Sequence, residues 1–367
     1  MRSTKRRWFA AGVLMTLTGG AASTAAATTE PPVAPVGPTS EAGGAIDFAA
    51  RSDVIEISDD QLAALEGQED VTVGIVAATM ATEYHANLNN AIQARAEELG
   101  FSAEIFDSQE DPNRQLQGIE GFISAGADAI IVTGLGGESI GPIAAEATGQ
   151  GIFVVQVAGR DLTESGAVTI SVEDEDIATA EGTAAGEYAA ATYPDGGIQV
   201  VITDYPSIES LVARADMIEE AFTATYPGAE FLPRILGGTA ENGVTSMETA
   251  LQANPDIVGV LGINDAGNLG AYQALENAGR GPDDVFIFGI DCDPQAVELI
   301  ESGTMYKGCV DTNPTGTGQL AADSFALWLA GGSVPGIIEV PVSVYTGGGA
   351  SASATTTADD MAPATTG

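Results

Sequence analysis

Three of the predicted strands in the second half of the chain end in polar side chains that suit a sugar-like ligand. Asn264, Asp291 and Asp311 each stand at or just beyond the end of such a strand. A carboxylate accepts hydrogen bonds from adjacent hydroxyls and an amide both donates and accepts, so these groups together can select one arrangement of hydroxyls. Residues of these types also cap helices, and we expect Asp265 to do so, because the next predicted helix begins immediately after it. Asn264 and Asp291 are therefore the leading candidates for contact with a polyhydroxylated ligand.

Aromatic side chains for the same ligand follow the first strongly apolar strand. Tyr84 offers an apolar ring with a hydroxyl, which suits the mixed surface of a sugar ring, and His85 can exchange one hydrogen bond with a hydroxyl. The alternative is that both residues begin the following helix and pack on its neighbours. His85 is the only histidine in the chain, so a metal site is not expected, and no G-x-S-x-G segment supplies a hydrolase nucleophile. We therefore predict no metal, no cofactor and no catalytic residue.

The elements between residues 71 and 133 indicate an α/β fold. Short apolar strands alternate there with amphipathic helical segments, a pattern typical of a parallel sheet with helices on both faces. A second set of the same kind begins at residue 198, and a chain of 367 residues exceeds the size of one core. Two lobes are therefore expected, with ligands bound beyond the carboxyl ends of their strands. The predicted strands are 71–77, 102–108, 128–133, 151–157, 167–172, 198–203, 230–236, 256–262, 285–290, 305–310 and 337–345.

The chain is predicted to cross between the lobes three times, near residues 172–174, 311–314 and 332–337. The last predicted strand contains Pro341, which has no backbone N–H, and is therefore expected at a sheet edge of the second lobe. The predicted fold class is α/β, with two doubly wound parallel-sheet lobes joined by a three-segment hinge. Its parts are a signal peptide (1–27), a linker (28–56), a first lobe (57–172 plus 313–334), a second lobe (173–312 plus 335–346) and a disordered tail (347–367).

The first residues are typical of an export signal. A basic start is followed by an apolar stretch from Phe9 to Leu17 and by small residues up to Ala27, and the stretch is too short to span a membrane. Arg6 and Arg7 fit a twin-arginine signal, with ordinary secretion equally open. No cysteine lies near the cleavage region, so a lipid anchor is not expected. We expect an exported protein, periplasmic or extracellular, that is associated with the cell envelope.

The charge of the chain excludes several partners. The formal net charge is −40, and the chain contains two lysines, Lys5 and Lys307. Such a field repels nucleic-acid phosphates and anionic lipids. The acidic residues are spread along the whole chain, a distribution that favours a surface adapted to high salt, where screening removes the self-repulsion. The acidic run 173–176 lacks the ligand spacing of a calcium loop and is expected to interact with the dipole of the following helix.

The chain contains two cysteines, Cys292 and Cys309. They lie at the ends of neighbouring predicted strands, and a disulfide between them would persist in an exported protein. Two separate buried thiols are the alternative, and the sequence leaves both open. Neither cysteine has a metal-ligand partner at a suitable spacing. A cysteine nucleophile is not expected, because the one histidine lies in the other lobe.

Four strand-end motifs together resemble one known family. The motifs are Phe106–Gln109, Ile263–Asp265, Phe288–Asp291 and Val310–Pro314. Their order and spacing, between residues 71 and 345, resemble the type I periplasmic binding proteins, and among these the ribose-binding-like sugar receptors of ABC importers. The resemblance implies a monomeric, non-enzymatic solute-binding protein. Such a protein captures a small ligand between its lobes by hinge closure and delivers it to a membrane permease.

The resemblance also assigns individual positions. Thr133 matches a ligand-contacting position of the first lobe. Thr312, two residues before Pro314, matches a polar contact of the second lobe, with Asp311 as the runner-up. Arg214 stands where the family has a structural arginine.

Several positions depart from the family pattern. The charged Asp-Arg pair that grips sugar hydroxyls is replaced by Ala158 and Gly159, with Arg160 displaced by two residues but still expected to reach the ligand. A sugar-contacting position of the second lobe is Val212, and an aromatic position near residue 238 is glycine. These departures argue against ribose itself and leave a sugar as the expected ligand class.

Two other functions stay open at this point. A sensory binding module for a nucleoside or a furanosyl signal molecule would keep the same fold, and the altered pocket favours it. An exported sugar-processing enzyme would need paired carboxylates, for which Asp291 and Asp311 are the candidate pair. A transcription regulator of related fold is excluded by the export signal, the acidic surface and the lack of an N-terminal helix-turn-helix.

Overall fold

The structure is a computed structural model, and it describes residues 43–52, 55–68, 70–134, 140–159 and 161–347. The predicted signal peptide, most of the predicted linker and the predicted tail lie outside these ranges, as does Arg160. Among the described helices, none combines the length and the apolar character needed to cross a membrane.

The first lobe is built on a sheet of seven parallel strands in the order β1-β13-β6-β5-β4-β2-β3. Every residue of β4 and β5 is buried, because helices cover both faces of the sheet. One apolar core lies between the sheet and α2 and α10, and another between the sheet and α3 and α4. The strands are β1 (Ile46–Ser52), β2 (Thr72–Ala77), β3 (Ser102–Asp107), β4 (Ala129–Thr133), β5 (Phe153–Val157), β6 (Val168–Ser171) and β13 (Val334–Glu339). The helices are α1 (Asp59–Leu65), α2 (Glu83–Glu98), α3 (Pro112–Ala125), α4 (Ile140–Gly149) and α10 (Pro314–Leu329), with a 3-10 turn at Thr163–Ser165.

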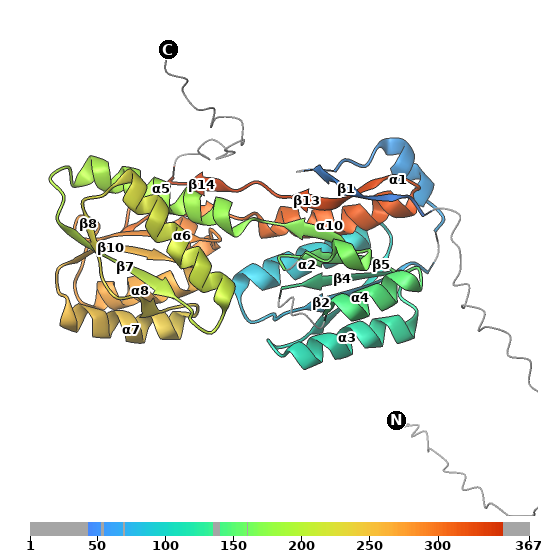
Figure 1. Ribbon diagram of the computed structural model, residues 1–367, viewed down its shortest axis with the longest axis horizontal. Coiled ribbons are helices and arrows are strands. Elements are labelled where there is room, and N and C mark those ends of the chain that lie inside the picture. The colour runs from blue at the N-terminus through green and yellow to red at the C-terminus, as the bar shows by residue number, and fades with distance from the viewer. Residues whose placement is uncertain (1–42, 53–54, 69, 135–139, 160, 348–367) are drawn as a thin grey trace, which may run out of the picture. The chain divides into compact units, whose positions relative to one another are not determined.

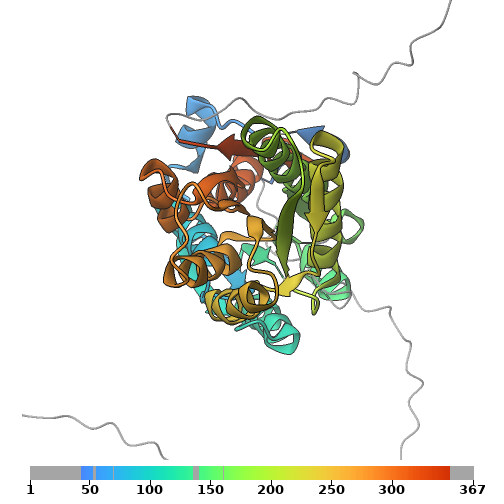
Figure 2. The same ribbon diagram turned by 90° about the vertical axis from the view of Figure 1, so that its left-hand side faces the viewer.

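The second lobe repeats this plan with the sheet order β14-β12-β11-β10-β7-β8, and β9 pairs with β7. Its pairs are parallel except for β14, which runs antiparallel to β12. Helices α5 and α6 cover one face and α7, α8 and α9 the other, as Figure 2 shows from the side of this lobe. The strands are β7 (Ile198–Asp204), β8 (Ala229–Phe231), β9 (Ile235–Leu236), β10 (Ile257–Gly262), β11 (Phe286–Ile290), β12 (Tyr306–Asp311) and β14 (Ser343–Tyr345). The helices are α5 (Asp174–Thr192), α6 (Glu209–Thr225), α7 (Ala240–Ala253), α8 (Asp265–Asn277) and α9 (Pro294–Glu301).

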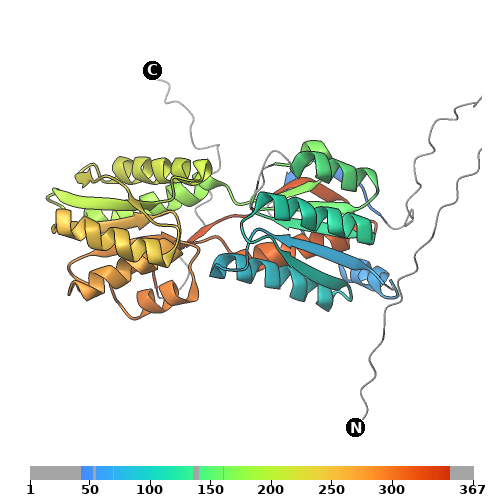
Figure 3. The same ribbon diagram turned by 90° about the horizontal axis from the view of Figure 1, so that it is seen from below.

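Three short segments carry the chain from one sheet to the other (Figures 1 and 3). They follow β6, β12 and β13, at residues 172–173, 312–313 and 340–342. The predicted fold class, two doubly wound lobes joined by three segments, is confirmed. The first two crossings lie where the sequence placed them, and the third lies several residues later.

The predicted boundaries differ from the structure in three places. The predicted linker contains β1, which pairs with β13 at the edge of the first sheet. The predicted last strand is two strands, because Pro341 ends the ladder: β13 belongs to the first sheet and β14 to the second, so assigning all of 335–346 to the second lobe was wrong. The predicted strand 230–236 is likewise divided into β8 and β9.

Helices α5 and α6, which carry charged groups of the candidate site, approach each other closely at Gly182. A Cβ atom on Gly182 would lie 2.5 Å from the carbonyl oxygen of Ile218 and 2.7 Å from the Cβ of Ala221. Glycine is therefore required here by the packing distance, although it lowers helix propensity.

We predict that Gly182→Ala lowers the free energy of unfolding by about 1–3 kcal/mol, because the two helices must separate to admit the methyl group. Gly121→Ala is the control: Gly121 is exposed in the middle of α3, and a methyl group added there would have no neighbouring atom within 4 Å. This second change should raise stability by about 0.5–1 kcal/mol through helix propensity alone. Denaturant unfolding of both variants in molar salt measures the difference, and equal effects would contradict the packing argument.

Candidate functional site

Asn264 lies at the carboxyl end of the second sheet as the N-cap of α8. Its side-chain oxygen accepts a hydrogen bond from Gly267 N at 3.0 Å, and its amide nitrogen donates to Gly238 O at 3.1 Å. An amide oxygen has two lone pairs and an amide nitrogen two protons, so each atom keeps one position for a ligand. The expectation that Asp265 caps this helix was wrong. Its carboxylate is fully buried, and accepts from Tyr306 OH at 2.5 Å and from Asp293 N at 2.8 Å.

Asp291 follows β11 in a left-handed backbone conformation, with φ of 102°. Its N–H donates to Val310 O at 2.9 Å, which ties the turn to β12. Burial of the carboxyl raises its pKa well above the usual value, and the nearby carboxylates of Asp265 and Asp293 raise it further. The Arg214 guanidinium acts in the opposite direction on the same pKa. Asp291 is therefore a carboxyl held among other carboxyls, with Arg214 as its main compensation among the described residues.

The charged pair of Arg214 and Asp174 belongs to this site and was missed from the sequence. Arg214, on α6, donates from Nε to Asp174 Oδ1 at 2.7 Å and also from Nη2 to the same oxygen. Its Nη1 donates to Ile263 O at 3.0 Å, directly before Asn264. From the sequence, we expected Arg214 to have a structural role and Asp174 to belong to an acidic run at the start of a helix. Because they stand 40 residues apart, no local pattern could have paired them.

Glu181, on α5, is a second group that sequence reasoning missed. It is fully buried, and its Oε1 accepts from Gly262 N at 3.0 Å, while Oε2 has no hydrogen-bond partner. Burial raises the pKa of this carboxyl well above its usual value, Arg214 lowers it and Asp291 raises it. A glutamate within the small residues of α5 was the available signal, since a carboxylate on a buried helix face needs a partner.

Tyr84 and His85 lie at the start of α2, whose N-cap is Thr82. The Thr82 hydroxyl lies 2.7 Å from Nδ1 of His85, and the two rings meet edge to face with centroids 5.1 Å apart. Burial lowers the pKa of His85 to about 4, so the ring is neutral near pH 7. Burial also raises the pKa of the Tyr84 phenol, and the next largest cause is the charge of Asp291. Tyr84 of the first lobe and Asp291 of the second therefore lie near enough for the charge of Asp291 to act on the pKa of the phenol.

Thr133 ends β4 in a buried polar network of the first lobe. Its hydroxyl donates to Asn89 Oδ1 at 3.0 Å, and its carbonyl accepts from Gln115 Nε2 at 3.2 Å. Asn89 in turn donates to the carbonyl of His85 at 2.7 Å, so the network supports the turn that carries the aromatic residues. Thr133 is completely buried, and its place is beneath Tyr84 and His85 rather than on an exposed surface.

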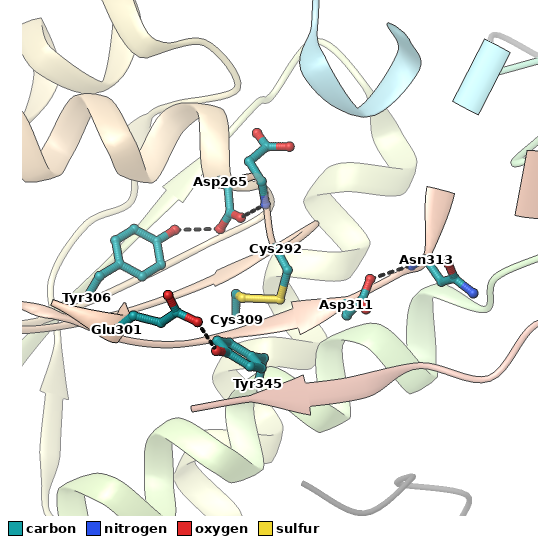
Figure 4. The surroundings of a disulfide bond; sticks show 9 residues. Asp265, Cys292, Glu301, Tyr306, Cys309, Asp311, Asn313 and Tyr345 are labelled. Atoms are coloured by element: carbon teal, nitrogen blue, oxygen red, sulfur yellow. Dashed lines mark hydrogen bonds between the residues drawn. A yellow bond between two sulfur atoms is a disulfide. The ribbon is translucent and has the colours of Figure 1, made fainter. Parts of the chain in front are cut away.

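Asp311 and Thr312 end β12 beside Asp291. The Asp311 carboxylate accepts from Asn313 N at 2.7 Å and so shapes the crossing into α10, whereas Thr312 is 3% exposed. The Thr312 hydroxyl oxygen is buried and has no hydrogen-bond partner among the described residues. Cys292 and Cys309 form a disulfide, with an S–S distance of 2.01 Å, between the Asp291 turn and β12 (Figure 4). The bridge thus belongs to the group of residues at the carboxyl ends of β10, β11 and β12, which we call the strand-end cluster.

The described residues contain no group of three or more His, Cys, Asp and Glu side chains arranged to hold a metal ion. What they offer is hydrogen bonding from the uncharged side chains of Tyr84 and His85 in the first lobe, supported by the buried Thr133, and from charged and polar side chains of the second lobe. The second-lobe set is Asp174, Arg214, Asn264, Asp291, Asp311 and Thr312. Such an arrangement can bind and orient a small polar molecule.

The model of the periplasmic binding protein domain family matches residues 73–333. This span covers most of both lobes and includes every candidate named above, and the chain belongs to that family. Within it, the expected type I class, with relatives among ribose-binding proteins, is confirmed.

Two relatives of known role illustrate the similarity. The ribose import binding protein of Bacillus subtilis is 25% identical over 288 residues, which cover 76% of this chain and 88% of the relative. The D-apiose import binding protein of Actinobacillus succinogenes is 29% identical over 216 residues, covering 58% of this chain and 67% of the relative.

Solved structures give the same fold. A solute-binding protein of an ABC transporter from Actinobacillus succinogenes, with bound D-allose, superposes with a TM-score of 0.68 at 21% identity and covers 76% of this chain and 98% of its own. One from Mycobacterium smegmatis, with bound glycerol, has a TM-score of 0.65 at 27% identity, over 76% of this chain and 94% of its own.

Asp293 gives a pH-dependent prediction for the site. Its carboxyl is 8% exposed, and burial together with the charge of Glu83 raises its pKa to about 6. The folded state therefore binds more protons than the unfolded state between about pH 4 and 6, and this group's contribution to stability is lost as the pH rises through that window. We expect Asp293→Asn to be more stable than the parent at pH 7 by about 2 kcal/mol.

The gain from Asp293→Asn should fall steeply as the pH drops to 4, where the parent carboxyl is protonated in the folded state and about half protonated in the unfolded state. Glu120→Gln, an exposed position on α3, is the control for simple loss of one negative charge. Urea unfolding between pH 4 and 7 measures both. A gain that is independent of pH, or the same in the control, would contradict the role of burial.

Proposed function

We propose that this chain is the extracytoplasmic solute-binding protein of an ABC importer, and that it captures a sugar or polyol between its lobes. The observation that carries the proposal is the convergence of candidate groups from both sheets, linked by the electrostatic interaction of Tyr84 with Asp291. Capture needs hydrogen bonding and closure but no bond breaking, so no catalytic residue, cofactor or metal is required.

The remaining hydrogen-bonding capacity of the candidates supports a hydroxyl-rich ligand. Asn264 keeps one donor and one acceptor after capping α8, and the Asp291 carboxyl can accept from two adjacent hydroxyls. The Tyr84 ring supplies an apolar face of the kind on which the C–H face of a sugar packs. Groups on opposite sides of the ligand would thus contact different lobes. Binding would therefore be coupled to closure of the two lobes about the three crossing segments.

The relatives support the same ligand class without selecting a member of it. Their names specify ribose, D-apiose and, for a protein of Mycolicibacterium smegmatis that is 28% identical, xylitol. The loop after β5, with Ala158 and Gly159 in place of a charged pair, argues against ribose for this chain. We infer a pentose, a hexose or a polyol as the cargo.

The partner and location follow from the same role. A signal peptide at 1–27 would export the chain to the periplasm or the cell exterior, and a membrane permease would accept the closed, loaded form. We infer a monomer. We also infer that it works in high salt, because carboxylates are spread along a chain with formal charge −40.

The first test is thermal unfolding of the mature protein in molar salt against pentoses, hexoses, polyols, nucleosides and amino acids. A ligand at 100 times its dissociation constant should stabilise the fold by about 2.7 kcal/mol. Stabilisation by one saccharide or polyol would support the proposal. Stabilisation by a nucleoside alone would favour a sensory module, and no effect from any sugar or polyol would contradict sugar capture.

The second test is Asp291→Asn, which keeps the shape of the side chain but replaces one carboxyl oxygen with an NH2 group that cannot accept a hydrogen bond. We expect the dissociation constant for the identified ligand to rise about 10- to 100-fold, since a buried ligand hydroxyl left without its acceptor costs roughly 1–3 kcal/mol. Asp283→Asn, an exposed carboxylate before β11 at the opposite end of the same strand, is the matched control. Calorimetric titration measures both, and unchanged affinity in Asp291→Asn would remove Asp291 from the site.

A further inference from the structure

We propose that the Cys292–Cys309 disulfide is a positioning element of the ligand site: it holds the turn that presents Asp291 toward Tyr84. This inference rests on the proposed function and deepens it, because it assigns a binding role to a bond that could otherwise serve stability alone. The geometry that points to it is the backbone on either side of the bridge.

Two consecutive residues of the turn adopt left-handed backbone conformations that L-amino acids disfavour. Asp291 has φ of 102° and Cys292 has φ of 51°. Aspartate tolerates this region moderately and cysteine poorly, and neither position is glycine. Such a pair persists only where the surroundings hold it. The conformation of this turn therefore depends on contacts with its surroundings.

The two ends of the disulfide differ in how firmly the fold holds them. Cys309 is completely buried in the middle of β12, paired with Gly289 of β11 and with Tyr345 of β14. Cys292 is partly exposed and lies beyond the last paired residue of β11. The bridge thus ties this turn to a strand that is paired on both sides, and Figure 4 shows the disulfide with Tyr345 nearby.

Other restraints on the turn are few among the described contacts. The Asp291 N–H donates to Val310 O at 2.9 Å, and the Asp293 N–H donates to Asp265 Oδ2 at 2.8 Å. Among the described residues, no backbone hydrogen bond involves Cys292, which the disulfide holds with the two Cα atoms 5.2 Å apart.

Charge adds a reason for the tether. The Asp291 carboxyl lies near those of Asp265 and Asp293, and the compensating guanidinium of Arg214 already binds Asp174. Ionisation of Asp291 beside another ionised carboxylate would drive its side chain outward, and a free turn would permit that movement. Because Thr312 follows directly on the last residue of β12, three residues after Cys309, the bridge also restrains Asp291 relative to Thr312.

The test is a double-mutant cycle between the disulfide and Asp291. The dissociation constant for the stabilising sugar or polyol is measured by calorimetry in molar salt for four proteins: the parent, Cys292→Ser/Cys309→Ser, Asp291→Asn and the triple variant. We expect the disulfide-free protein to bind at least 10-fold more weakly. Asp291→Asn should then cost less than 3-fold in that background, because the bridge acts through Asp291.

A variant that lowers stability elsewhere in the same lobe separates positioning from stability. Ile198→Ala removes a buried side chain at the amino end of β7, the opposite edge of the sheet. It should leave the dissociation constant within 2-fold, at a salt concentration where all variants are folded. If the serine variant does not fold, reduction of the folded parent protein gives the same comparison without a substitution.

Hydrogen exchange supplies a readout that needs no ligand. Loss of the bridge should speed exchange of the Asp291 amide at least 10-fold more than that of the Ile287 amide, which donates to Met305 O within the same strand pair. A parent protein that binds no sugar or polyol would contradict the proposed function, while exchange would still decide whether the bridge holds the turn. Unchanged affinity, additive effects in the cycle or equal exchange at both amides would overturn the inference.

Discussion

The site depends on one constraint of parallel sheets: all strands of a sheet end at the same edge. A helix must return the chain to the start of each next strand, so each carboxyl end is followed by a helix N-terminus and a short loop. Asn264 illustrates the result, since its side chain caps α8 and still faces a neighbouring loop at Gly238. Tyr84 and His85 stand at the corresponding place in the first lobe, at the start of α2. Residues far apart in the sequence therefore meet at this edge because of the sheet topology alone.

Several carboxyl groups lie near this edge of the second sheet, and few cations among the described residues lie beside them. Glu181 and Asp265 are completely buried, and each satisfies a backbone N–H of a neighbouring loop: Gly262 for the first, Asp293 for the second. Burial raises the pKa of both carboxyls, which means that the neutral form is favoured inside the lobe. Arg214 is the cation that joins this group, through Asp174 and the carbonyl of Ile263. Protonation and one guanidinium together make the cluster compatible with folding.

The order of strands and helices could be read from the sequence because apolar runs and helical patterns alternate locally. The predictions that were wrong or missing required information from residues distant in the sequence. Arg214 and Asp174 are paired across 40 positions, and Glu181 gains its partner from the end of β10. The N-cap of α8 is Asn264, one residue before the predicted Asp265. The sequence could not show that the Asp265 carboxylate is already engaged by Tyr306 and Asp293. The division of the last strand depended on the register of β13 with β6, which its own sequence does not carry.

That division has a consequence for how the lobes are connected. β13 pairs in parallel with β6 of the first sheet, and after a crossing of three residues β14 pairs with β12 of the second. The segments after β6 and β12 start from these same two strands. The strands that bracket the crossings are thus hydrogen-bonded neighbours within each sheet: β6 with β13 in one, β12 with β14 in the other. A hinge made of short segments anchored in adjacent strands permits rotation of one lobe against the other while it resists sliding. Asp311 and Thr312 stand at the start of one such segment, so a ligand bound there would contact both the site and the hinge.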